Sequence, residues 1–108
     1  MKLPKCPVEL TMLFLADRKK IMIICYLLKG TLRAEILLEL VGGVSKNKLT
    51  KILHELEALG VIERIVYKEI PPKVEYSLTE FGMSFSDIIE TMNVWGIEYL
   101  KILVSEEF

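Results

Sequence analysis

The sequence, 108 residues long, predicts a mainly α-helical α+β domain. Two observations predict this fold class. In SKNKLTKILHELEALG, from Ser45 to Gly60, leucine and isoleucine recur at the spacing of one face of a helix. After Gly60 the pattern changes to the alternation of a half-buried strand, in VIERIVY and again in VEYSL. We therefore expect helices first, then a β-hairpin, and then further helix.

Three helices are expected before the Ser45 segment. Pro7 suits the first position of a helix over residues 6–16, and Asp17 is a typical N-cap for RKKIMIICYLLK, which ends at Gly30. A short extended piece at residues 31–32 precedes a third helix, which ends at the glycine pair of residues 42–43. Each expected boundary is thus marked by a residue that favours it.

The remaining elements complete a winged helix-turn-helix. Ser45 is expected to cap a recognition helix over 45–59, and residues 61–78 are expected to form a two-stranded wing with KEIPPK at its tip. Thr79 should cap a long final helix over 80–104, with a break near Gly96. Because no linker or repeat interrupts the pattern, residues 1–108 are expected to form a single domain.

Composition argues against several classes of protein. The longest apolar run, IMIICYLL, is less than half of the roughly 20 residues that span a bilayer. Two cysteines and one histidine cannot complete a four-ligand zinc site, and there is no glycine-rich phosphate loop or Ser-His-carboxylate arrangement. We therefore expect a cytoplasmic protein that is not an enzyme, with no cofactor, no metal and no membrane partner.

Charge is distributed unevenly along the chain. Residues 1–54 contain ten Lys and Arg against four Asp and Glu, whereas residues 55–108 contain four against eleven. The net charge of −1 therefore hides a basic half and an acidic half. This asymmetry predicts a basic face on an acidic body.

The chain resembles the HxlR family of transcription regulators, relatives of the MarR group, and the resemblance needs no gaps over about nine tenths of the chain. It departs from the usual family pattern at Lys19, Ala34 and Ile36. The resemblance implies a winged helix that binds double-stranded DNA as a homodimer. The residues that carry it are Cys6, Pro7, Val8, Glu9, Gly30, Leu32, Arg33, Ser45, Leu49, Thr50, Leu53, Leu56, Glu57, Gly60 and PPKVEYSLTEFG from Pro71 to Gly82.

The candidate DNA-binding residues lie on the recognition helix and the wing. A helical projection places Asn47, Thr50, Lys51 and His54 opposite the apolar stripe, on a face without acidic residues. Lysines on such a face can also be simple solvated charges, and a winged helix can serve as a protein–protein module that never contacts DNA. The full candidate set is Ser45, Lys46, Asn47, Lys48, Thr50, Lys51, His54, Arg64, Lys68 and Lys73, with Lys73 preferred in the wing.

Cys6 is a candidate redox- or electrophile-sensing residue. It precedes a helix and lies near Lys2 and Lys5 in the sequence, and both a helix start and nearby cations favour a thiolate. Some relatives use a cysteine at this position for sensing. The alternative is a small, inert residue at a packed helix start.

The final helix predicts a homodimer. Its apolar residues recur at alternating steps of four and three, as in a helix that keeps one seam against a partner, although the domain's own core could cover part of this seam. A two-fold dimer would require a pseudo-palindromic operator, whereas a small-molecule effector is left open. The candidate interface comprises Val8, Met12, Leu15, Phe85, Ile88, Met92, Trp95, Tyr99 and Ile102.

Overall fold

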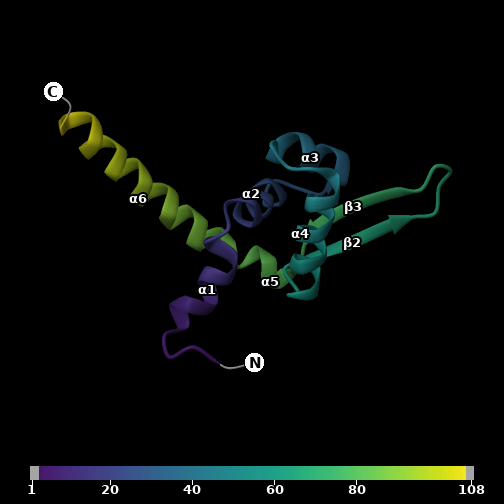
Figure 1. Cartoon of the computed structure of the whole chain (residues 1–108), viewed down its shortest axis with the longest axis horizontal. Helices are drawn as coiled ribbons and strands as arrows, with labels where there is room; N and C mark the ends of the chain where they lie inside the picture. The colour runs from purple at the N-terminus through teal and green to yellow at the C-terminus, as the bar shows by residue number, and fades with distance from the viewer. Residues whose placement is uncertain (1–2, 107–108) are drawn as a thin grey trace.

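The computed structural model describes residues 3–106 and confirms a mainly helical winged helix-turn-helix (Figure 1). Among these residues no helix is both long and apolar enough to cross a membrane. The elements in chain order are α1 (Pro7–Leu15), α2 (Arg18–Leu27), β1 (Leu32–Arg33), α3 (Ala34–Val41), α4 (Lys46–Ala58), β2 (Ile62–Tyr67), β3 (Lys73–Leu78), α5 (Glu80–Met83) and α6 (Phe85–Glu106).

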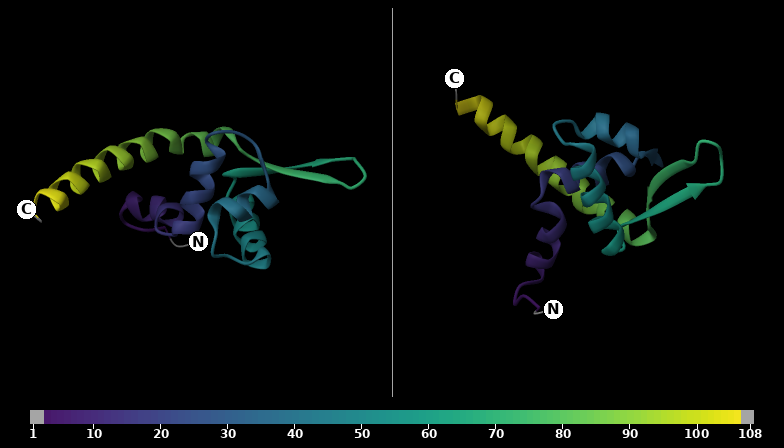
Figure 2. Two further views of the ribbon diagram at one scale, coloured as in Figure 1. Left: turned by 90° about the horizontal axis from the view of Figure 1, so that it is seen from above. Right: turned by 45° about the vertical axis from the view of Figure 1, so that its right-hand side comes forward.

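The wing belongs to a three-stranded antiparallel sheet of order β1-β3-β2. Strands β2 and β3 pair from Ile62 opposite Leu78 to Tyr67 opposite Lys73, and the hairpin projects from the body (Figure 2). The sequence predicts only these two strands. The third pairs Leu32 with Tyr76, and two residues are too few to show a strand period, so β1 was predicted only as an extended piece.

The predicted N-caps are present. The carboxylate of Asp17 accepts hydrogen bonds from the backbone N–H groups of Lys19 and Lys20, and the Ser45 hydroxyl accepts one from Lys48 at 3.1 Å. Thr79 caps α5 by accepting from Gly82 N–H at 3.0 Å, and its hydroxyl lies 2.6 Å from the carbonyl oxygen of Gly60. Gly60 has φ +80, so it ends α4 in the left-handed region.

The core lies between helices α2, α3 and α4 and the sheet. Phe85 also belongs to it: the side chain is only 4% exposed, and its ring lies 5.2 Å from that of Phe14 between centroids. Its expected place in a dimer seam is therefore corrected, because the start of α6 still packs on the domain. The buried residues are Ile23, Ile24, Leu27, Leu37, Val41, Leu49, Ile52, Leu53, Leu56, Val61, Ile62, Tyr76, Leu78 and Phe85.

The final helical region breaks at Ser84, and the expected break at Gly96 is wrong. Helix α6 runs through Gly96 without interruption because a glycine inside a helix costs only about 1 kcal/mol and does not remove a hydrogen bond. Beyond the core, α6 extends away from the body on the side opposite the hairpin (Figures 1 and 2). The molecule is consequently elongated, with principal extents of 58 × 38 × 24 Å.

Gly82 gives a direct test of the packing at the base of the wing. A Cβ atom at this position would lie 2.1 Å from the backbone oxygen of Val61, so Gly82→Ala must displace backbone. We expect it to lower the free energy of unfolding by about 2–4 kcal/mol, measured by urea denaturation. The control Ser86→Ala, at an exposed position, should change it by less than about 0.5 kcal/mol. Equal stability of the two variants would contradict this packing.

Candidate nucleic-acid interface

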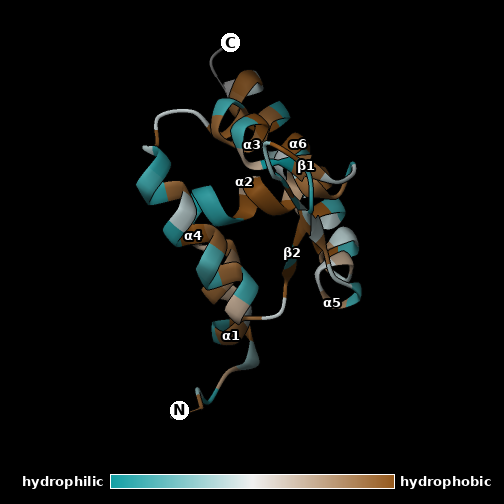
Figure 3. Ribbon diagram, turned by 90° about the vertical axis from the view of Figure 1, so that its right-hand side faces the viewer, coloured by the Kyte–Doolittle hydropathy of each residue, from teal (hydrophilic) through white to brown (hydrophobic). Residues whose placement is uncertain are grey.

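Helix α4 has one buried face and one exposed polar face. Leu49, Ile52, Leu53 and Leu56 are buried, and the hydrophilic first turn of the helix lies at the surface (Figure 3). This arrangement follows from the 3.6-residue period, because the apolar stripe turns every intervening residue outward. The candidate residues on α4 and its cap are all exposed: Ser45, Lys46, Asn47, Lys48, Thr50, Lys51 and His54.

Hydrogen bonding divides these exposed residues into two groups. The Ser45 hydroxyl is engaged as the cap, and the Thr50 hydroxyl donates to the Lys46 carbonyl at 2.9 Å. Among residues 3–106, by contrast, no side-chain hydrogen bond or ion pair engages Asn47 or Lys51. These two side chains are therefore available for an external partner.

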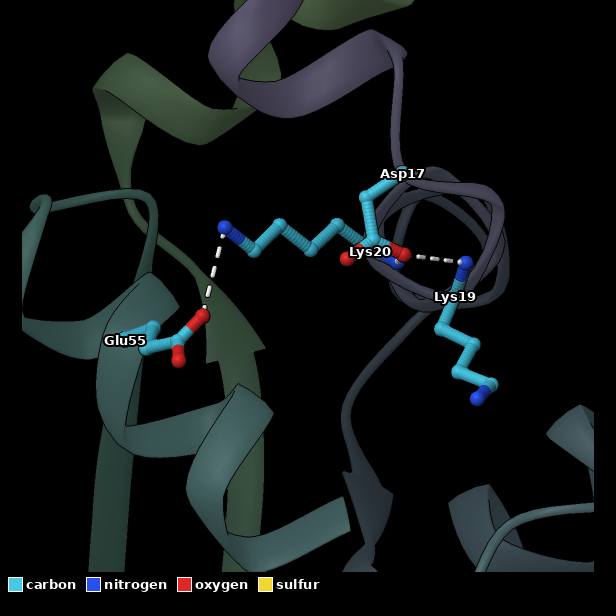
Figure 4. Close-up of polar contacts among 4 residues, drawn as sticks. All are labelled: Asp17, Lys19, Lys20 and Glu55. Carbon is cyan, nitrogen blue, oxygen red and sulfur yellow. Dashed lines mark hydrogen bonds and ion pairs between the residues drawn. The ribbon is translucent and has the colours of Figure 1, made fainter. Parts of the chain in front are cut away.

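The first acidic residue of α4 is held by another helix. The carboxylate of Glu55 lies 3.2 Å from the Lys20 ammonium of α2, whose side chain is only 16% exposed (Figure 4). This ion pair partly neutralises Glu55 and connects α4 with α2. The sequence does not predict this ion pair, because the two residues are far apart in the chain and neither has a local signal. Within the described part of the chain, no carboxylate lies within ion-pair distance of Lys46, Lys48 or Lys51.

The wing carries three cations, and within residues 3–106 only Lys73 among them has an intramolecular partner. Arg64 and Lys68 are exposed, whereas Lys73 lies 4.6 Å above the ring of Tyr67 and 3.8 Å from the carboxylate of Glu75. The hydrogen bond and the negative charge of Glu75 also raise the pKa of Tyr67. The structure does not test the preference for Lys73 in the wing. Because Lys73 already has intramolecular partners, we expect Lys68 to be the more available of the two.

This difference leads to an expected result for the wing. Lys68→Ala should lower the slope of log K against log salt for duplex binding by about 1 per protomer, because one phosphate contact is lost. Lys73→Ala should change the slope by less, because its charge already faces Glu75. Fluorescence anisotropy with a labelled duplex at several salt concentrations measures both slopes. A larger change in the Lys73 variant than in the Lys68 variant would contradict this ranking.

The two cysteines have different surroundings. Cys6 is exposed and is the N-cap residue of α1, but its side chain makes no capping hydrogen bond. Cys25 is half-buried in α2, and this burial raises the pKa of its thiol, with a smaller opposing effect from Lys29. Of the two thiols, Cys6 is thus the more accessible to a reagent in solution.

Helices α1 and α6 expose a large apolar surface. Trp95 is 68% exposed, and its ring stacks on Tyr99 at 5.4 Å between centroids. Leu15, unlike most of the expected interface residues, is half-buried against the core. The remaining members of the candidate interface are exposed: Val8, Met12, Ile88, Met92, Trp95, Tyr99 and Ile102.

Together these features define a winged helix-turn-helix protein. The second helix of its helix-turn-helix motif is α4, and the N-terminal half of α4 is basic and contains no acidic residue. Comparison with known proteins agrees: residues 14–103 match the family described as HxlR-like helix-turn-helix. The chain belongs to this family, as its motifs indicate.

Individual relatives are transcriptional regulators. The uncharacterized HTH-type transcriptional regulator YtcD of Bacillus subtilis is 39% identical over 101 residues, which are 94% of this chain and 80% of that protein. The redox regulator HypR in its reduced form superimposes with a TM-score of 0.84 at 36% identity, covering 93% of this chain and 99% of the other. The reduced form of the transcriptional regulator YodB from B. subtilis gives 0.75 at 34% identity, covering 88% and 91%.

Proposed function

We propose that this protein is a sequence-specific regulator that binds double-stranded DNA as a homodimer, with α4 in the major groove. The observation that carries the proposal is the start of α4, where the lysines are exposed and no carboxylate of residues 3–106 lies within ion-pair distance of them. The nearest acidic residue of the helix is held by Lys20. A recognition helix meets base edges through its N-terminal residues, so a face without acidic residues is needed there.

The side chains of α4 suit two kinds of contact. The side-chain amide of Asn47 can pair with adenine, its oxygen accepting from one adenine group and its NH2 donating to another, and Lys51 can donate to the guanine acceptors. Ser45, Lys46 and Lys48 surround the helix N-terminus, which itself favours phosphate oxygens. The same helix would thus provide both positioning and sequence recognition.

The remaining candidates would act at the margins of this contact. Thr50 has its hydroxyl proton engaged and offers a methyl group to thymine, whereas His54 lies one turn further along the helix. Arg64 and Lys68 of the wing would contact the phosphate backbone beside α4. Lys73, held by Glu75, is the weakest of the wing candidates.

The exposed apolar surface of α1 and α6 supports a homodimer. Contiguous apolar patches of this kind are uncommon on monomers, and most of α6 lies beyond the core that could cover it. A second copy of the chain would cover these residues through a two-fold interface, and two α4 helices would then meet successive turns of DNA. The expected operator is therefore pseudo-palindromic.

A selection of bound fragments from the source genome tests this function. The purified protein is mixed with sheared genomic DNA, the retained fragments are sequenced, and the enriched motif is checked for two-fold symmetry. We expect a motif with half-sites about one helical turn apart, or a multiple of it. If no motif is enriched, the protein is better described as a protein–protein module without DNA binding.

We also propose that Cys6 makes this DNA binding responsive to oxidants or electrophiles. Its exposed thiol at the start of α1 supports the proposal, as does the similarity to a redox regulator. Helix α1 belongs to the surface assigned to the dimer, so a modified Cys6 would change the relative position of the two protomers. The affinity for DNA should then change as the dimer changes.

Treatment with peroxide or a quinone should alter operator affinity roughly 5- to 150-fold in the native protein, the usual range of coupling between two sites. Cys6→Ser should abolish the response, whereas the control Cys25→Ser should keep it. Electrophoretic mobility shifts before and after treatment measure the effect. Sensing by Cys6 is excluded if Cys6→Ser responds like the native protein.

A further inference from the structure

A pocket of about 250 Å³ lies between α3 and α4, beside the proposed DNA-binding surface. Its lining comes from three elements: α3, α4 and strand β3. The α4 residues that line the pocket are three or four positions apart and so lie on one side of that helix. The α3 residues that line it belong to the first turns of α3. The lining residues are Ala34, Glu35, Leu38, Lys46, Leu49, Thr50, Leu53 and Tyr76.

The pocket has an apolar interior and a charged mouth. Leu49 and Leu53 are buried core residues that form its base, and Leu38 is half-buried beside them. Glu35 and Lys46 are exposed, so their opposite charges lie where the pocket meets solvent. The interior thus favours an apolar group, and the mouth gives no net preference for an anion or a cation.

Tyr76 lines this pocket and brings a phenol hydroxyl to its neighbourhood. The residue is only 4% exposed, and no side-chain hydrogen bond engages its hydroxyl among residues 3–106. Every fully enclosed side-chain oxygen and nitrogen in that range does have a hydrogen-bond partner, so the Tyr76 hydroxyl must retain contact with open space. Tyr76 lines the pocket, so we take its hydroxyl to be available to a molecule that enters the pocket from solvent.

We propose that this pocket binds a small, neutral aromatic compound that carries one hydroxyl or carbonyl oxygen. The ring would lie against Leu38, Leu49 and Leu53, and the oxygen would accept a hydrogen bond from Tyr76. A cavity of about 150 Å³ is enough for benzene, so 250 Å³ is enough for roughly two fused rings.

The pocket adjoins two residues assigned to DNA contact, which gives the ligand a regulatory consequence that rests on the proposed function. Lys46 and Thr50 line the pocket and also belong to the exposed start of α4. A ligand at the mouth would restrict the Lys46 side chain and occupy space next to the duplex. Ligand and DNA therefore oppose each other, and by linkage each lowers the affinity for the other by the same factor.

The probe for the test is 2-naphthol, a bicyclic compound with one hydroxyl. Titration into the full chain without DNA, followed through the NMR signals of the leucine methyl groups, should give saturable shifts at Leu38, Leu49 and Leu53. The expected dissociation constant is roughly 1 mM or lower for a ligand of this size. The anion 2-naphthoate should bind more weakly, because its carboxylate would lose hydration on entering the apolar interior.

Two variants act on different parts of the site. Tyr76→Phe removes only the hydroxyl and should weaken 2-naphthol binding about fivefold, as expected for one hydrogen bond. Ala34→Phe fills the pocket and should abolish saturable binding, whereas the control Ala58→Phe adds the same ring at an exposed position outside it. Unfolding curves of each variant show whether the fold is kept, and Tyr76→Phe keeps the test valid if Ala34→Phe does not fold.

The outcomes separate the pocket from the DNA-binding function. The proposal that this pocket binds the ligand is wrong if 2-naphthol causes no saturable shifts, or shifts only around Trp95. It is also wrong if 2-naphthol binds the native protein and Tyr76→Phe with equal affinity. Operator affinity measured without any ligand tests DNA binding by itself. If the protein binds its operator but 2-naphthol at saturation leaves that affinity unchanged, the regulatory consequence is wrong.

Discussion

Trp95→Ala is expected to convert the protein from a dimer to a monomer at micromolar concentration. Trp95 is 68% exposed in the protomer, so its removal costs the isolated fold little. In a two-fold interface each substitution counts twice, and a buried tryptophan anchor contributes about 2 kcal/mol or more. The dimer dissociation constant should therefore rise about a thousandfold, measured by sedimentation equilibrium.

Ile70→Ala is the matched control for this experiment. Ile70 is a fully exposed apolar residue in the turn between β2 and β3, and this hairpin projects away from α6 (Figure 1). It should leave the dimer unchanged. The dimer through α6 is contradicted if Trp95→Ala keeps its mass, or if the native protein is a monomer that binds a single half-site with full affinity.

Asn47→Ala and Lys51→Ala should each weaken operator binding by about 1–3 kcal/mol and relax sequence preference. The physical reason is that both side chains are exposed on α4 and have no intramolecular partner among residues 3–106. They are therefore available for base contacts, and truncation to alanine removes those contacts. Competition between the operator and variants with single base-pair changes, followed by anisotropy, measures both effects.

Glu57→Ala provides the control on the same helix. Glu57 is exposed on α4 but lies in its last turn, away from the expected base contacts. Its removal should leave sequence preference as it is. Unchanged binding in both Asn47→Ala and Lys51→Ala, with intact folds, would remove α4 from the recognition role.

The fold could be predicted from the sequence wherever a local signal marks it. The caps Asp17, Ser45 and Thr79 and the change of period after Gly60 depend on neighbouring residues, and all are present in the structure. Strand β1 could not be predicted because its pairing with β3 is made by residues distant in the sequence. The expected break at Gly96 failed because glycine weakens a helix without ending it.

The candidate site could be predicted in part. The exposed face of α4 follows from helical periodicity, so its candidate residues were correctly expected at the surface. The engagement of Lys73 by Tyr67 and Glu75 depends on the strand register and on which face of the sheet each side chain takes. Likewise, the seam pattern of the final helix includes Phe85, and periodicity alone cannot distinguish a partner's surface from the domain's own core.

The central claim, that α4 and the wing bind DNA through phosphate and base contacts, is tested most directly by the salt dependence of operator affinity. With Lys46, Lys48, Arg64 and Lys68 of each protomer on phosphates, a dimer would make about eight such contacts. The slope of log K against log salt should then be about −7, and affinity should fall roughly ten-thousandfold between about 50 and 200 mM salt. Absence of duplex binding at the lowest salt, or an affinity that does not change with salt, would contradict the claim.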